Sequence, residues 1–114
     1  MESNTLAHEI VDAAADKKAA NILMLDVRPV TLLADYFVIC EGSTARQIRA
    51  IVEGVRESLR ERRVNPLHAE GSADAGWVLL DYSDVILHVF SPEVRRYYDL
   101  EDLWREAPVV VRML

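Results

Sequence analysis

The sequence has very little cysteine and no long hydrophobic run. Cys40 is the one cysteine among 114 residues, which excludes an internal disulfide and suits a reducing cytosol. Its place at the end of an apolar segment predicts a small buried side chain and not a catalytic thiol. No apolar stretch approaches membrane-spanning length, and the first ten residues, MESNTLAHEI, lack the basic and apolar regions of a signal peptide. We therefore expect a soluble, cytoplasmic protein that contacts no membrane.

The short motifs of nucleotide and metal sites are also absent. The sequence contains no GxxxxGK(S/T), GxGxxG, CxxC or HxxxH pattern, and its three histidines are widely scattered. A nucleotidyltransferase needs a Gly-Ser turn before a helix and then two metal-binding carboxylates that alternate on a strand. Gly42 and Ser43 supply the turn, but no Asp-x-Asp pair follows, and Asp81 and Asp84 lie at a turn. We expect that the protein is not an enzyme and binds no cofactor or metal. The alternative is a nucleotidyltransferase-like nucleotide-binding enzyme.

Positive charge is in deficit. The sequence has nineteen acidic and thirteen basic residues, a net charge of −6. This charge disfavours unassisted binding to a phosphate backbone, although a local basic patch could still exist. The length predicts one domain over residues 1–114 with a single core. We place that core at about residues 5–104 and treat 105–114 as a C-terminal tail.

Hydrophobic patterning predicts an α/β domain. Helices are expected over 5–20, from Thr44 onward as the longest helix, and from Pro92 to Tyr97 or Tyr98, followed by a short helical turn. Strands are expected over 22–27, 36–40, 77–80 and 85–90, with an edge strand at 64–68 and a surface loop at 69–76. The tail after Pro108 either adds an edge strand, pairs with another copy, or hangs loose.

The longest expected helix carries mixed charge with an excess of arginine towards its C-terminal end. A solvated face, with cations placed at the negative end of the helix dipole, is the preferred interpretation. Contact with RNA is the alternative.

The stretch 76–104 is the most strongly specified part of the chain. A two-residue loop of Tyr82 and Ser83 would set Asp81 opposite Asp84 and Trp77 opposite His88. One face of this hairpin is then wholly aliphatic, and the other mixes aromatic, acidic and imidazole groups. The members of the mixed face are Trp77, Leu79, Asp81, Asp84, Ile86, His88 and Phe90.

This mixed face is predicted to be a docking surface. Carboxylates that face one another destabilise a ladder unless they reach solvent or a cationic partner, and tryptophan is enriched at interface centres. An acidic rim around a tryptophan therefore indicates a basic partner. A half-covered sheet with an interior Trp and His is the alternative.

Three segments resemble the ribosomal silencing factor family, also called Iojap-like proteins. They are ADYFVICEGSTARQIRAI at 34–51, PLHAEG at 66–71 and GWVLLDYSDVILHVFSPEVRRYYDLEDLW at 76–104. The resemblance covers nearly the whole chain and departs mainly at Ser83, where the family usually has glycine. It implies a mixed sheet of about five strands with flanking helices, related in topology to nucleotidyltransferases but without their catalytic acids.

The resemblance also implies a function. The family represses translation by binding the large ribosomal subunit through its protein fourteen, which blocks joining of the small subunit when nutrients are short. The docking residues carried over to this chain are Trp77, Asp81, Tyr82, Asp84 and His88, bordered by Tyr97 and Tyr98. Trp77 is expected to anchor the contact, the two aspartates to pair with basic residues, and His88 to lie at the patch centre.

The net acidic charge leads us to expect docking on ribosomal protein, with at most a minor contact to ribosomal RNA and none to DNA. A homodimer that uses the tail or the hairpin surface is a further hypothesis.

Overall fold

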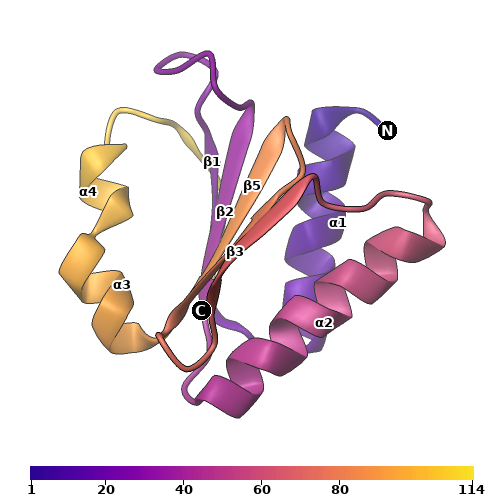
Figure 1. Ribbon diagram of the computed structural model, residues 1–114. Helices are drawn as coiled ribbons and strands as arrows, with labels where there is room; N and C mark the ends of the chain where they lie inside the picture. The colour runs from indigo at the N-terminus through magenta and orange to yellow at the C-terminus, as the bar shows by residue number, and fades with distance from the viewer.

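A six-stranded mixed sheet organises the computed structural model, which describes residues 1–114 (Figure 1). The strands are β1 (Ala20–Asp26), β2 (Tyr36–Glu41), β3 (His68–Ser72), β4 (Trp77–Asp81), β5 (Val85–Phe90) and β6 (Val109–Met113). The helices are α1 (Ser3–Asp16), α2 (Ala45–Glu61), α3 (Pro92–Tyr98) and α4 (Leu100–Leu103). The strand order is β3-β4-β5-β2-β1-β6, and only β2 and β5 run parallel. The α/β prediction is confirmed, but with six strands in place of about five.

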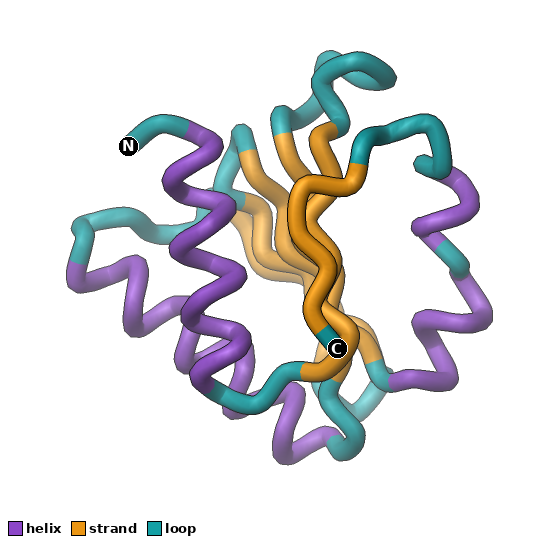
Figure 2. Tube along the Cα trace, turned by 180° about the vertical axis from the view of Figure 1, so that it is seen from behind, coloured by secondary structure: helices purple, strands orange, loops and turns teal.

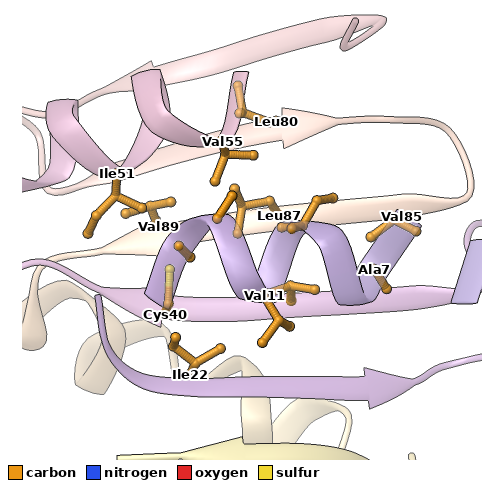
Figure 3. Close-up of a cluster of buried hydrophobic side chains, with 14 of the residues drawn as sticks. Ala7, Val11, Ile22, Cys40, Ile51, Val55, Leu80, Val85, Leu87 and Val89 are labelled. Carbon is orange, nitrogen blue, oxygen red and sulfur yellow. The ribbon is translucent and has the colours of Figure 1, made fainter. Parts of the chain in front are cut away.

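Helices cover both faces of the sheet, as the two opposite views show (Figures 1 and 2). The long helices α1 and α2 bury the larger core, a cluster of 22 residues, against one face. Figure 3 shows aliphatic side chains of both helices meeting those of the strands in this cluster. The short helices α3 and α4 cover the other face, where Val94, Leu100 and Trp104 pack on a cluster of eight buried residues from β1, β2, β5 and adjoining loops.

Two predicted helix starts are confirmed with their caps. Thr44 precedes α2, and its Oγ1 accepts from the Gln47 N–H (3.1 Å). Ser91 precedes α3, and its Oγ accepts from the Val94 N–H (3.2 Å). The first helix is shorter than expected, Ser3–Asp16 in place of 5–20, because the chain turns at Lys18 (φ 65°) and β1 already begins at Ala20.

The predicted edge strand at 64–68 is wrong. The edge strand is β3, His68–Ser72, most of which lies in the segment expected to be a loop. Its residues are small or polar and all are exposed, so no hydrophobic pattern marks them. Gly71 adopts φ 81° in this strand, and a Cβ there would lie 2.1 Å from the Trp77 carbonyl oxygen, so this position requires glycine.

Of the three alternatives that the sequence left open for the tail, the structure has the edge strand. Residues 109–113 form β6, which pairs antiparallel with β1 and adds an edge strand to the sheet. The register shifts between Met24 and Leu25 of β1, so this edge is irregular. Such irregularity is a common protection of edge strands against uncontrolled pairing.

The predicted hairpin register is also wrong, by two residues. Trp77 pairs with Phe90, Leu79 with His88 and Asp81 with Ile86, so Asp81 does not face Asp84. The turn is displaced towards the C-terminus, since the Tyr82 N–H donates to the Val85 carbonyl (2.9 Å). A shift of two residues leaves each strand residue on its predicted face, because side chains alternate with a period of two.

Ser83 makes this turn strained. Its φ is 74°, its N–H donates to Asp81 Oδ1 (2.7 Å), and the Asp84 N–H donates to the Tyr82 carbonyl (3.0 Å). A hydrogen bond between residues i and i+2 around a positive φ is the pattern of a strained γ-turn.

We predict that Ser83→Gly raises the free energy of unfolding by up to about 1 kcal/mol, because glycine adopts positive φ without strain. Urea unfolding monitored by tryptophan fluorescence measures this. Ser83→Ala is the matched control, since it removes the hydroxyl and keeps the Cβ. Equal stabilisation by both substitutions would show that backbone strain at Ser83 is not the cause.

Candidate functional site

The helices α3 and α4 leave part of the sheet uncovered. Val94, Leu100 and Trp104 pack on buried residues of β5, β2 and β1, whereas residues of the neighbouring strands β4 and β3 line an open groove on this side. A groove of about 680 Å³ lies there, between these two strands and α3. We call it the aromatic groove. Its lining residues are Glu70, Gly71, Ala75, Trp77, Leu79, Glu93, Val94, Tyr97 and Tyr98.

Trp77 is the central side chain of this groove. It is half-buried, and its ring contacts Tyr98 (4.6 Å between centroids) and Phe90 (5.0 Å). Tyr97 lies at right angles to Tyr98 (5.0 Å, 89°) and is 81% exposed. Aromatic rings held in this way present a large apolar surface at low entropic cost, which suits binding of another macromolecule.

His88 holds Trp77 in place from below. The Trp77 Nε1–H donates to His88 Nδ1 (3.2 Å), and the imidazole also makes an edge contact with Phe37 (5.5 Å). Only 6% of His88 is exposed, and this burial lowers its pKa to about 4. At neutral pH the ring is therefore uncharged and able to accept the indole hydrogen bond. His88 lies beneath the groove, not at the centre of its surface as the sequence suggested.

Two acidic side chains line the groove, and two more lie beyond it towards the hairpin turn. Glu70 and Glu93 line it, whereas Asp81, at the end of β4, and Asp84, in the hairpin turn, do not. None of the four takes part in an ion pair. This leaves negative charge around an apolar surface, which favours a partner with lysine or arginine at the contact.

Arg95 fixes the helical wall of the groove. Helix α3 has no fully buried residue, so packing alone holds it weakly. The Arg95 side chain is only 12% exposed; its guanidinium pairs with Glu41 (3.1 Å) and Glu101 (2.5 Å) and donates to the Asn21 carbonyl (2.6 Å). These contacts tie α3 and α4 to the ends of β1 and β2, which sets the position of Tyr97 and Tyr98.

Tyr82 does not belong to this site. It lies on the opposite face of the sheet, within the larger core, and is 5% exposed. Its hydroxyl has no hydrogen-bond partner, and burial raises its pKa to about 12. The alternation along β4 explains this, because Tyr82 follows Leu80 and Val78 on the same side. Tyr82 is thus a core residue and not the docking residue that the sequence suggested.

Some groove residues were missed by the sequence analysis. Leu79 was placed on the correct face but not in the docking set, and Glu70 was assigned to a loop. Glu93 and Val94 were assigned only to a helix start. The alternation of Trp77, Leu79 and Asp81 was the one signal that could have included Leu79. Glu70 and Glu93 come to line the same groove only in the folded chain.

The Gly42–Ser43 turn offers little to a phosphate group. The Ser43 N–H and hydroxyl both donate to Gln47 Oε1 (2.8 and 3.0 Å), and Gln47 Nε2 donates to the Lys18 carbonyl (2.9 Å). The donors that could cradle a phosphate at the start of α2 are thus occupied within the chain. No group of three or more His, Cys, Asp or Glu side chains is arranged to hold a metal ion. None of the helices has the length and apolar composition needed to cross a membrane.

Comparison with known proteins shows similarity over almost the whole chain. The family model described as "Ribosomal silencing factor during starvation" matches residues 1–113. Ribosomal silencing factor RsfS of Halalkalibacterium halodurans is 38% identical over 110 residues, which cover 96% of this chain and 94% of the relative. That of Bacillus subtilis is 42% identical over 97 residues, covering 85% and 82%. The chloroplastic protein Iojap of Arabidopsis thaliana is 34% identical over 106 residues, covering 93% of this chain and 44% of the plant protein.

Solved structures show the same similarity. A crystal structure of a protein from Chromobacterium violaceum superposes with a TM-score of 0.87 at 36% identity, covering 91% of this chain and 87% of that one. A second, from Bacillus halodurans, has a TM-score of 0.83 at 36% identity, covering 95% and 98%. The family match over residues 1–113, these relatives and the shared fold lead to one conclusion: the chain belongs to the ribosomal silencing factor family.

Proposed function

We propose that this protein represses translation by binding the large ribosomal subunit through its protein fourteen and excluding the small subunit. The observation that carries the proposal is the aromatic groove, an apolar surface at Trp77, Leu79, Tyr97 and Tyr98 that the chain itself does not cover. Its relatives are named ribosomal silencing factors, a regulatory role.

The charges around the groove indicate the chemistry of the partner. The carboxylates of Glu70 and Glu93 line the groove and form no ion pair, which favours a protein segment that carries lysine or arginine next to apolar side chains. A ribosomal protein, which lies among RNA phosphates, commonly has such basic segments. Docking then acts by occupying space, so repression needs no turnover, cofactor or metal. The proposal places the protein in the cytoplasm, where bacterial ribosomes act.

The nucleotidyltransferase-like alternative has less support. The Ser43 donors are bonded to Gln47, and no group of three or more His, Cys, Asp or Glu side chains is arranged to hold a metal ion. The homodimer hypothesis keeps the aromatic groove and the outer edge of β6 as candidate interfaces. Part of the tail that it invoked is already paired with β1.

Sedimentation with isolated ribosomal subunits tests the proposed function. We expect the wild-type protein to co-migrate with large subunits and not with small ones. We further expect that pre-binding lowers the fraction of joined particles when small subunits are added. Purified protein fourteen, added in excess, should compete for the silencing factor and restore joining. Absence from the large-subunit fraction, or joining that is unchanged at saturation, would overturn the proposal.

A further inference from the structure

A second groove lies on the opposite face of the same sheet edge. It has a volume of about 520 Å³ and lies between α2 and the strands β3 and β4. We call it the arginine groove; its lining residues are Arg49, Val52, Glu53, Arg56, Glu57, Arg60, Gly71, Ser72, Ala73 and Val78. Gly71 of β3 lines both grooves. The two grooves therefore lie on either side of the exposed edge strand β3. A large binding partner that contacts this edge of the sheet would lie next to both grooves.

The arginines of this groove form one row. Arg49, Arg56 and Arg60 are separated by seven and four residues, spacings that place helical side chains on the same side. The row spans eleven residues, or about 16 Å along the helix axis. It is therefore long enough to meet several charged groups of an extended polymer.

These arginines are available to an external anion. Arg56 and Arg60 form no ion pair in the chain, although Glu53 and Glu57 line the same groove. Arg49 reaches Asp74 at 3.4 Å, but both side chains are more than half exposed, at 54% and 85%. An exposed pair of this kind contributes little free energy and exchanges readily for a better partner.

Phosphate is the anion that this arrangement fits. The planar guanidinium donates two parallel hydrogen bonds to phosphate oxygens, and a row of such groups along a groove follows a nucleic acid backbone. Three arginines beside two glutamates leave little net positive charge, in a chain whose overall charge is −6. Affinity for free RNA should accordingly be weak. The groove would act only where a second contact holds RNA beside it.

We propose that the arginine groove binds the phosphate backbone of ribosomal RNA next to the protein on which the aromatic groove docks. The inference rests on the proposed function, because docking at Trp77 is what brings this sheet edge to the subunit surface. The aromatic groove then supplies specificity, and the arginine groove adds a salt-sensitive interaction on the other side of β3.

The test compares the salt dependence of binding to isolated large subunits. For Arg56→Gln/Arg60→Gln we expect several-fold weaker binding at low salt. We also expect a smaller slope of log affinity against log salt, by about 0.7 for each phosphate that the variant no longer neutralises. Chemical probing of the ribosomal RNA should show protections by the wild type that are missing with the double variant. Glu53→Gln/Glu57→Gln should have the opposite effect and strengthen binding.

Arg46→Gln is the matched control, because Arg46 lies exposed on the same helix, forms no ion pair and does not line the groove. An unchanged slope in the double variant, or an equal loss of affinity in Arg46→Gln, would overturn the inference. Weaker binding with intact RNA protections would also overturn it and would indicate an acidic protein surface in place of RNA. If the wild type does not bind large subunits, the proposed function fails first. If it binds and the double variant matches it, only the arginine groove fails.

Discussion

Trp77→Ala should weaken binding to the large ribosomal subunit by roughly thirtyfold or more. Truncating a tryptophan at the centre of an interface typically costs about 2 kcal/mol or more, and about 1.4 kcal/mol corresponds to a tenfold change. Trp77 forms the middle of the aromatic groove and supports Tyr98 at 4.6 Å, so its removal also loosens the groove wall. Equilibrium binding to purified large subunits, followed by sedimentation, measures the effect.

The control for this prediction must separate binding from stability, because Trp77 also packs on the smaller core. Trp104→Ala serves well. Trp104 is likewise half-buried and packs on the same cluster, with an edge contact to Phe37 (5.3 Å, 90°), but it does not line the aromatic groove. We expect both variants to lose stability in urea unfolding and only Trp77→Ala to lose affinity. Equal loss of affinity in both would place the docking surface elsewhere.

The free energy of unfolding should fall by up to about 3 kcal/mol between pH 6.5 and pH 4 because of His88 alone. The pKa of this imidazole is about 4 in the folded chain and 6.5 without the fold. Between these values the unfolded chain binds more protons, so stability is complete above pH 6.5 and is lost as the pH falls. Each unit of pKa difference corresponds to about 1.36 kcal/mol. This figure is an upper limit, since the buried ring can relax on protonation.

The comparison with His88→Asn isolates this contribution, because all other titrating groups are shared. We expect the variant to be less stable than the wild type at pH 7 and to have a flatter stability profile down to about pH 4.5. His68→Asn is the matched control, since it replaces an exposed histidine by the same residue. A wild-type profile that matches that of His88→Asn would show that His88 does not titrate in this range. Indole side-chain NMR would report release of the Trp77 N–H as the histidine protonates.

Much of the site could be predicted from local patterns. The alternation along 77–81 and 85–90 places Trp77 and His88 on one face and Val78 and Leu80 on the other, whichever register the hairpin adopts. The starts of α2 and α3 followed from Thr44 and Ser91, whose caps involve residues only three positions away. The resemblance to ribosomal silencing factors, carried by ordered short motifs, is confirmed by the family match over residues 1–113.

Other features depend on contacts between distant residues. The strand β3 has no hydrophobic pattern. It forms because its backbone pairs with that of β4, with Glu70 opposite Leu79. The register depends on where the chain adopts a positive φ, and Ser83 does so although serine does not favour it; the glycine usual in the family at this position was the one sign. The alternation of Val78, Leu80 and Tyr82 already indicated the buried face for Tyr82, and the docking set carried over from the family disagreed with it; the helices that cover this face are set by the tertiary fold.

The strand faces, the helix starts and the family are all properties of the sequence alone, because each follows from neighbouring residues or their spacing. The partial cover of one sheet face by α3 and α4, which leaves the aromatic groove open with His88 buried beneath it, arises only in the folded chain. The same holds for the arginine groove behind the edge strand β3. Burial and groove shape result from packing between elements far apart in the chain, and no local pattern encodes that packing.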